Sequence, residues 1–305
     1  MFLKILVPLD GSEVAECVLP HVQALASGSE DAAVNFIYVV APLDTPMIDP
    51  KYKKMIEADA KASAGDYLRK LIAKSGLKSK AKATIVLGKV ADTIVDYSSK
   101  NKMDLIVMAT HGRSGVNRWF YGSVADKVIH EARTPVWQVK AASCHKASYS
   151  LNRKLRIFVP LDGSEVAESV LKQLKEISRQ FPKNKLDIIL ARVCEIFSPP
   201  VGYPPPLSMS WEESIAYEKK RCMTICQDYL SRVQDKLNKS GVKTRTEVPE
   251  GNPAEVLIDF INKNSIDLVI LSTHGRTGFS RWAFGSIAEK VLKGSESPVL
   301  LVRAK

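Results

Sequence analysis

Short apolar runs alternate with longer stretches of mixed polarity along the whole chain. In the first half, the apolar runs occupy residues 4–9, 33–40, 82–87, 104–110 and 135–139. In the second half, the corresponding stretches are residues 154–161, 186–193, 242–248, 267–273 and 298–302. Continuous apolar runs of this length are typical of strands that are buried on both faces of a sheet. The pattern therefore predicts five buried strands in each half.

The stretches between the runs carry helix signals. In the first half we expect helices over residues 12–26, 52–74, 91–99 and 123–133. Ser12 is a candidate N-cap, and Ser75-Gly76 is a stop signal. Strands joined by helical crossovers predict a parallel sheet with helices on both faces, which is an α/β fold.

The two halves are copies of one pattern. The stretch "KILVPLDGSEVAECVL" from Lys4 returns as "RIFVPLDGSEVAESVL" from Arg156. The stretch "VMATHGRSGVNRWFYGSVADKV" from Val107 returns as "ILSTHGRTGFSRWAFGSIAEKV" from Ile270. The period is far too long for a solenoid. We therefore predict two tandem domains of one type, over residues 1–143 and 154–305, with a polar joint between them.

The repeated motifs fall at the ends of the first and fourth strands of each half. In a strand order of 3-2-1-4-5, these two strands are neighbours at the point where the winding direction reverses. Ligands of such sheets bind beyond the carboxyl ends of the strands at this point. We therefore expect Asp10-Gly-Ser and Ala109-Thr-His-Gly to border one crevice, and their copies to border a second.

The second motif has the composition of a phosphate cradle. Gly112 and Gly115 allow the backbone to approach a ligand closely, and Arg113 can donate to phosphate oxygens. Gly122-Ser123 begins a helix, whose free N–H groups attract anions. The alternative is that the glycines serve tight turns and that Ser123 is only an N-cap. The retention of the motif in both copies favours the anion site.

With these motifs the sequence resembles the universal stress protein family in its tandem, Rossmann-like two-domain form. The ATP-binding members of that family carry G-x-x-G, nine residues, and then G-S or G-T. The counterparts here run from Ala109 to Gly112 and on to Gly122-Ser123, and from Ser272 to Gly275 and on to Gly285-Ser286. The first glycine is replaced by Ala109 and Ser272, and we expect modest crowding rather than loss of the site.

The resemblance implies a set of nucleotide-binding residues in each half. Asp10 and Asp162 would lie near the ribose and phosphates and help to hold Mg²⁺, unless they only cap the turns that follow them. Val39 and Val193 would contact adenine, whereas His111 and His274 would orient ligand rather than act as general bases. The full set is Pro8, Asp10, Val39, Ala109, Thr110, His111, Gly112, Arg113, Gly115, Gly122, Ser123, Val124, Pro160, Asp162, Val193, Ser272, Thr273, His274, Gly275, Arg276, Gly278, Gly285, Ser286 and Ile287.

The function implied by the resemblance is binding of ATP or AMP with Mg²⁺ by a stress-response regulator or sensor that acts through an unknown protein partner. A slow ATPase is the first alternative, although the phosphate loop lacks the lysine of G-x-x-x-x-G-K-[ST]. A nucleic-acid-associated stress protein is another. The net charge is +11 but is spread over both halves, which argues against a nucleic-acid interface. A flavin or electron-transfer role on the same fold is the weakest option.

Three further expectations concern the state of the protein. The chain has no apolar run of about 18 residues and no signal-peptide pattern, so we expect a cytoplasmic protein that does not span a membrane. The five cysteines have no metal-site spacing, and we expect reduced, mostly buried thiols. We expect the fifth strands of the two halves to pair within one chain, giving a pseudo-twofold monomer or, by further association, a homodimer.

Overall fold

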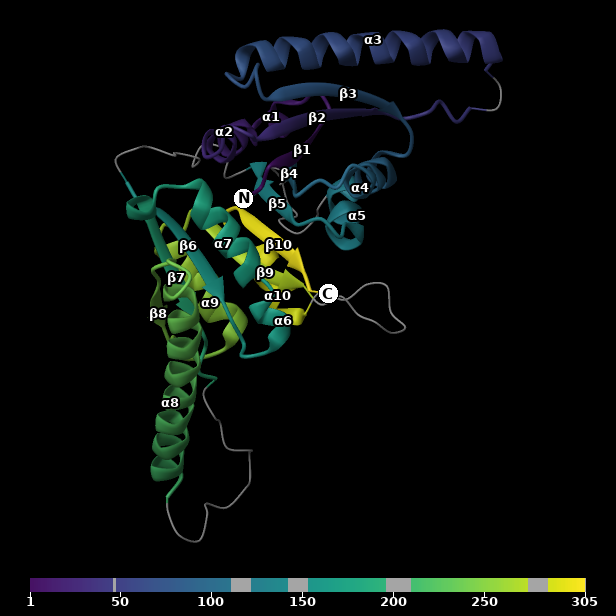
Figure 1. Ribbon diagram of the computed structural model, residues 1–305. Helices are drawn as coiled ribbons and strands as arrows, with labels where there is room; N and C mark the ends of the chain where they lie inside the picture. Colours follow the sequence, from purple (N-terminus) through teal and green to yellow (C-terminus); the bar gives the residue numbers. More distant parts are fainter. Residues whose placement is uncertain (46–47, 111–121, 142–152, 196–209, 274–284, 305) are drawn as a thin grey trace.

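The computed structural model describes residues 1–45, 48–110, 122–141, 153–195, 210–273 and 285–304, and Figure 1 shows its helices and strands. The elements of the first half are β1 (Lys4–Leu9), α1 (Glu13–Glu16), α2 (Leu19–Ser27), β2 (Ala33–Val40), α3 (Pro50–Lys74), β3 (Ala81–Leu87), α4 (Val90–Lys100), β4 (Leu105–Thr110), α5 (Ser123–Glu131) and β5 (Val136–Lys140). The elements of the second half are β6 (Leu155–Pro160), α6 (Glu165–Glu168), α7 (Leu171–Gln180), a 3₁₀ turn (Lys183–Lys185), β7 (Leu186–Ala191), α8 (Trp211–Asn238), β8 (Arg245–Glu247), α9 (Pro253–Lys263), β9 (Leu268–Thr273), α10 (Ser286–Gly294) and β10 (Val299–Arg303).

The ten strands form one sheet in the order β3-β2-β1-β4-β5-β10-β9-β6-β7-β8. Each half has the predicted order 3-2-1-4-5, and within each half neighbouring strands are parallel. The halves meet at β5 and β10, which pair antiparallel with Trp137 opposite Leu300. The α/β fold, the strand order and the pairing of the fifth strands within one chain are therefore confirmed.

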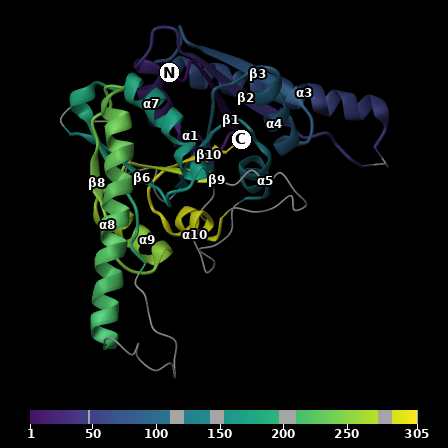
Figure 2. The same ribbon diagram turned by 60° about the horizontal axis from the view of Figure 1, so that its bottom comes forward.

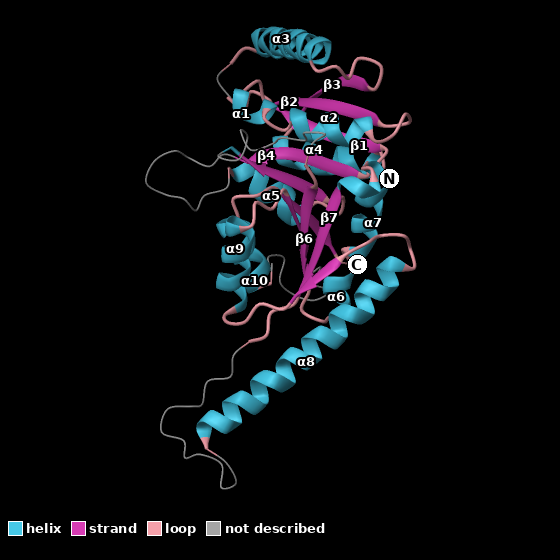
Figure 3. Cartoon of the chain, turned by 90° about the vertical axis from the view of Figure 1, so that its left-hand side faces the viewer, coloured by secondary structure: helices cyan, strands magenta, loops and turns pink. Residues whose placement is uncertain are grey.

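Helices cover both faces of this sheet. On one face, side chains of α2, α3, α7 and α8 form a core that continues across both halves, and Trp137 of β5 is fully buried in it. On the other face, α4, α5, α9 and α10 pack over a second core. The long helices α3 and α8 lie at opposite ends of the molecule, and Figures 1, 2 and 3 all show α8 projecting beyond the sheet.

Two elements differ from the sequence pattern. The helix expected over residues 12–26 is split into α1 and α2, although Ser12 caps α1 as predicted by accepting a bond from the Ala15 N–H at 3.1 Å. Pro20 lies in the first turn of α2, but the second copy breaks at the same place with Lys172 there, so the proline alone does not cause the break. The strand expected over residues 242–248 is shorter in the structure: β8 covers Arg245–Glu247, the three residues that pair with β7.

Candidate functional site

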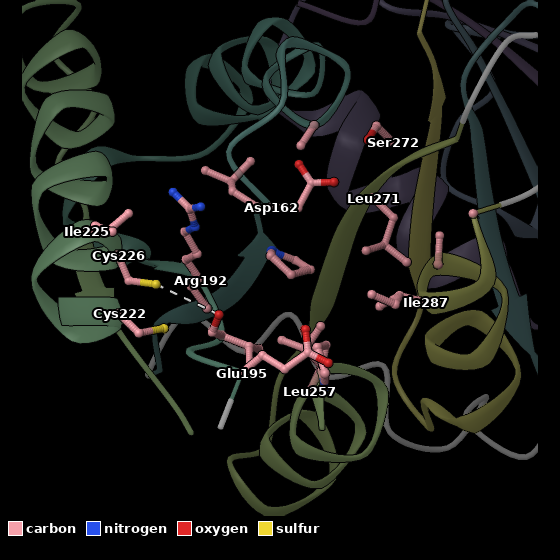
Figure 4. A pocket seen from close by; sticks show the side chains of 18 of the residues that line it. Asp162, Arg192, Glu195, Cys222, Ile225, Cys226, Leu257, Leu271, Ser272 and Ile287 are labelled. Atoms are coloured by element: carbon pink, nitrogen blue, oxygen red, sulfur yellow. Dashed lines mark hydrogen bonds between the residues drawn. The ribbon is translucent and has the colours of Figure 1, made fainter. Parts of the chain in front are cut away.

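The carboxyl ends of β6, β7 and β9 and the start of α10 enclose a cavity of about 670 Å³ in the second half (Figure 4). The strands β6 and β9 are neighbours at the point where the winding direction reverses, as in the expected crevice. Seven predicted site residues line the cavity: Pro160, Asp162, Val193, Ser272, Gly285, Ser286 and Ile287. The structure thus brings four separate segments of the predicted set together.

The start of α10 offers backbone donors to this cavity. Gly285 is the N-cap and Ser286 is the first helical residue, so no side chain caps the first N–H groups. The first half has the same arrangement, with Gly122 as the N-cap of α5 and Ser123 in the first turn. Ser123 is therefore not an N-cap, which removes one part of the purely structural alternative. A helix start without a side-chain cap favours an anion.

The two aspartates cap the turns that follow them. Asp10 Oδ1 accepts bonds from the Ser12 N–H at 3.0 Å and from the Ser12 hydroxyl at 2.6 Å. Asp162 Oδ1 accepts a bond from the Ser164 N–H at 2.8 Å. The Asp162 carboxylate also lies on the cavity wall in Figure 4, so the capping role and a ligand role are compatible.

The described ranges contain no group of three or more His, Cys, Asp or Glu side chains able to hold a metal ion. A single carboxylate still suits Mg²⁺, which binds through one or two carboxylates and substrate phosphates while keeping several waters. Asp162 therefore fits a magnesium ion that arrives with a nucleotide.

The residues expected near adenine differ between the halves. Val193 is partly buried and lines the cavity, whereas Val39 is buried in the second core. Beside Val193, the Arg192 guanidinium lies 4.8 Å from the centre of the Tyr229 ring and lines the same cavity. The strand register places Tyr38 at the position of Arg192, and its hydroxyl donates to the Asp10 carbonyl at 3.2 Å.

A tyrosine lies beneath this position in each half. The Tyr67 hydroxyl donates to Glu16 Oε1 at 3.0 Å, and burial together with this bond raises the pKa of Tyr67. Burial also raises the pKa of Tyr229, although the nearby Arg192 charge opposes the rise. Both phenols therefore stay protonated at neutral pH and contribute ring surfaces rather than bases.

The residues at the ends of the fourth strands have different surroundings. The Thr110 hydroxyl is buried and accepts a hydrogen bond from Gln138 Nε2 at 2.9 Å, so this side chain satisfies a buried amide of the neighbouring strand. Ala109 packs on the opposite face, against the core that contains Trp137, and Thr273 accepts a backbone bond from Ala304 through its carbonyl at 3.1 Å. Only Ser272 of this group lines the cavity, and the crowding expected there stays a prediction.

Part of the predicted site lies outside the described residues. This part comprises His111, Gly112, Arg113, Gly115, His274, Gly275, Arg276 and Gly278. Their roles stay predictions that rest on the sequence resemblance. Of the remaining first-half residues, Pro8 lies in β1 beside Ile37 of β2, and Val124 packs partly buried against the second core.

One wall of the cavity was not anticipated from the sequence. The helix α8 contributes Glu218, Arg221, Cys222, Ile225 and Cys226 to it, and Arg192 and Glu195 border it after β7. The spacing i, i+3, i+4, i+7 and i+8 places these five α8 residues on one helix face. It does not say what that face covers, because this depends on where α8 crosses the sheet.

The expectation of reduced thiols is wrong for Cys194 and Cys222, which the structure joins in a disulfide with a Cα–Cα distance of 5.7 Å. Cys17 is also disulfide-bonded, whereas Cys226 is a free, buried thiol as expected. Cys194 and Cys222 lie 28 positions apart with the proline-rich stretch between them, so their sequence spacing carried no signal of proximity. Their meeting depends on the packing of α8 against the end of β7.

Together, the sheet and the cavity define a tandem Rossmann-like α/β protein with a ligand crevice at a topological switch point. A sequence profile of the universal stress protein family matches residues 1–140 and 155–303. The chain therefore belongs to the universal stress protein family, with two copies of the family's domain in tandem.

Individual relatives agree with this assignment. Universal stress protein MJ0531 of Methanocaldococcus jannaschii is 34% identical over 148 residues, which are 48% of this chain and 81% of that protein. A universal stress protein of Mycolicibacterium smegmatis is 26% identical over 217 residues, 71% of this chain and 66% of that protein. The crystal structure of a universal stress protein from Archaeoglobus fulgidus superposes with a TM-score of 0.72, covers 99% of both chains and is 16% identical, which shows the shared fold.

Within the described segments, no helix combines the length and the apolar character needed to cross a membrane.

Proposed function

We propose that the protein binds an adenine nucleotide at the carboxyl end of the sheet in each half. The observation that carries the proposal is the second-half cavity. Its lining includes Pro160, Asp162, Val193, Ser272 and the start of α10. These are the positions that the family's ATP motif assigns to ribose, base and phosphates. The volume of about 670 Å³ is in the range of small-molecule sites.

Different residues would contact the phosphates, the magnesium ion and the base of the nucleotide. The N–H groups at the start of α10, with Ser286 in its first turn, would hold the phosphates. Asp162 would share a magnesium ion with the phosphates, which supplies charge neutralisation there. The backbone around Val193 would pair with the edge of the base, and α8 would close the opposite side.

We propose a regulatory rather than a catalytic role. The described residues that line the cavity include no lysine and no histidine, which are common phosphate-activating and proton-transferring groups. Nucleotide occupancy would instead change the affinity of the protein for a partner protein. We place this activity in the cytoplasm, and no catalytic residue is proposed.

The direct test is the nucleotide content of the purified protein. We expect mass spectrometry of the denatured wild type to release ATP or AMP, and calorimetry to measure binding at both sites. One universal stress protein has been solved in complex with cAMP, so cyclic AMP belongs in the ligand panel.

The matched variant is Gly122→Val combined with Gly285→Val, which places side chains where the phosphates would lie. A Cβ on Gly122 has no described atom within 4 Å, so its valine has room in the fold. We expect loss of bound nucleotide with thermal unfolding unchanged within about 0.5 kcal/mol. Nucleotide retained at wild-type affinity would show that the phosphates bind elsewhere.

A further inference from the structure

The second half has two cysteines in the cavity lining, Cys222 and Cys226, and a third beside it, Cys194, at positions where the first copy has none. The strand registers align Val39 with Val193, so Val40 stands at the position of Cys194. The shared stretch Asp-Tyr-Leu at 66–68 and 228–230 aligns Ala60 with Cys222 and Ala64 with Cys226. Cys222 and Cys226 line the second cavity, Cys194 lies between the lining residues Val193 and Glu195, and the counterparts of all three in the first copy are small apolar residues. This chemistry is therefore a property of the second half.

Cys194 is a rigid anchor at the end of β7. Its side chain is buried, its N–H donates to the Pro249 carbonyl at 2.9 Å, and its carbonyl accepts from the Gly251 N–H at 3.0 Å. These two bonds tie Cys194 to the segment after β8. The position of its sulfur is thus set by the sheet and not by α8.

Cys222 lies where α8 leaves the body of the protein. From Cys226 onward the helix buries Tyr229, Leu230, Val233 and Leu237 against the core. Before Cys226, among residues 211–225, only Ser214 is buried. Figure 3 shows this amino-terminal half of α8 extending away from the sheet. Apolar packing therefore holds the second half of the helix but not the first.

The weakly packed part of α8 is also the wall of the cavity. It supplies Glu218, Arg221, Cys222 and Ile225 to the lining, and Figure 4 places Cys222 and Ile225 opposite α10. Besides the disulfide, an ion pair joins Lys219 to Glu250 at 2.7 Å, but both side chains are partly exposed and such pairs contribute little. The disulfide is the strongest described tie between this wall and the sheet.

The first copy holds the equivalent helix without sulfur. There the Glu57 carboxylate of α3 accepts a bond from the Leu43 N–H at 3.3 Å. Such a bond does not respond to thiols or oxidants. The two halves thus use different chemistry for the same task, and only the second half can respond to redox conditions through this wall.

We propose that Cys194 and Cys222 form a reversible disulfide that holds the α8 wall of the second cavity, so that its oxidation state sets the ligand affinity of the second half alone. The binding part of this inference rests on the proposed nucleotide-binding function; the redox part does not. Where disulfides occur in reducing compartments, they are commonly transient and redox-sensing, as a bond that holds one wall of a binding cavity can be.

The exchange is a two-electron reaction with a dithiol reductant. One thiolate of the dithiol attacks a sulfur of the Cys194–Cys222 bond, which breaks and releases the other cysteine as a thiolate that takes up a proton. The second thiol of the reductant then attacks the mixed disulfide, releasing the remaining cysteine and leaving the reductant oxidised. An oxidised dithiol reverses both steps.

The third thiol does not take part. The Cys226 thiol donates weakly to the Val193 carbonyl at 3.8 Å, and burial raises the pKa of this thiol although the Arg192 charge opposes the rise. A protonated, buried thiol is a poor nucleophile. Cys226→Ala, which installs the residue of the first copy, is therefore the matched control.

The first experiment needs no nucleotide. Protein kept without reductant and protein treated with a dithiol are compared in two measurements. One sample of each is alkylated under denaturing conditions and digested. Hydrogen exchange of residues 211–225 is followed in a separate, folded sample of each. We expect the peptides of Cys194 and Cys222 to be protected from alkylation only before reduction, and exchange of this segment to become faster after reduction. Full alkylation before reduction, or unchanged exchange, would overturn the proposal.

The second experiment measures ATP affinity by calorimetry in the Gly122→Val background, where only the second site is expected to bind. We expect affinity to fall about five- to tenfold on reduction, because binding must then order the wall. Cys194→Val with Cys222→Ala should show the weaker affinity in both states, and Cys226→Ala should keep the redox dependence. Equal ATP affinity of the oxidised and the reduced protein would overturn the proposal that the disulfide sets the affinity.

The two proposals can fail separately. Adenine nucleotide could fail to bind in either state while the hydrogen exchange of residues 211–225 still depends on reduction. The proposed ligand would then be wrong, but the proposal of a reversible disulfide that holds the α8 wall would stand. If nucleotide binds equally in both states, then the proposed function stands and the redox control does not.

Discussion

At the scale of single residues, His21 is a buried titratable group in α2. Its ring centre lies 5.9 Å from that of Trp137, and burial lowers the pKa of the imidazole to about 4. The folded pKa lies below the ordinary 6.5, so the unfolded chain takes up a proton first as the pH falls. The free energy of unfolding therefore has its full value above pH 6.5 and decreases between pH 6.5 and 4.

The size of this effect is roughly 3 kcal/mol at pH 4, from about 1.4 kcal/mol for each unit of pKa shift. His21→Gln, which installs the residue found at the equivalent position 173, should remove this contribution to the pH dependence. Urea unfolding of both proteins at pH 7 and pH 4.5 measures it. Identical losses of stability in the two proteins would show that His21 does not titrate as its burial implies.

Gly28 is a second residue whose role is set by its surroundings. A Cβ built on it would overlap the Gln180 carbonyl and lie 2.8 Å from Gln180 Cα, where the ends of α2 and α7 meet across the two halves. Gly28→Ala must therefore push the helices apart. We expect a loss of about 1–3 kcal/mol in the free energy of unfolding.

Gly122→Ala is the matched control for this change, because its Cβ has no described atom within 4 Å. Urea unfolding should place it within about 0.5 kcal/mol of wild type. Equal stability of Gly28→Ala and wild type would contradict the close approach of the two helices.

At the scale of elements, the fifth strand of each half caps a helix of the other half. Lys140 of β5 donates from Nζ to the carbonyls of Lys293 and Ser295 at 2.7 and 2.6 Å, at the end of α10. Arg303 of β10 reaches the carbonyls at the end of α5 more loosely, at 3.4 Å. Cationic side chains satisfy the free carbonyls at helix ends.

The two caps should differ in strength. Burial lowers the pKa of Lys140 to about 8, so the ammonium is still largely charged at pH 7, whereas Arg303 is exposed. We expect Lys140→Met to cost about 1–3 kcal/mol at pH 7, because it leaves buried carbonyls without this donor. Arg303→Met should cost less than about 1 kcal/mol. Denaturant titration measures both, and a larger loss for Arg303→Met would reverse this ranking.

At the scale of the whole molecule, the antiparallel pairing of β5 and β10 joins the two sheets inside one chain. This pairing leaves β3 and β8 as the edges of the described sheet, under α3 and α8 (Figure 1). Because the central strands are already paired, no second chain is needed to complete them.

We therefore expect analytical ultracentrifugation at micromolar concentration to give the mass of one chain, 33.7 kDa. A protein found only as a dimer of twice this mass, with the fifth strands exchanged between chains, would contradict the intramolecular pairing. A reversible dimer that dissociates on dilution is compatible with it.

The sequence by itself predicted the strands and, once the order 3-2-1-4-5 is assumed, the location of the crevice; the order itself is shown by the structure. Buried parallel strands must be apolar on both faces, so runs such as "KILVPL" are visible without a structure. The internal repeat identified the motifs after the first and fourth strands, and the geometry of doubly wound sheets placed them together. These features depend on short stretches of chain and on general rules of chain connection.

Only the tertiary structure decided the α8 wall, the Cys194–Cys222 bond and the capping of each half by the other. Each of these depends on the angle and distance at which separate elements meet. Residues on an exposed helix face or at a strand end carry no pattern that names their partner. Contacts of this kind arise from the packing of the whole sheet. The free energy of that packing comes from many residues in separate segments, so no single segment of sequence predicts them.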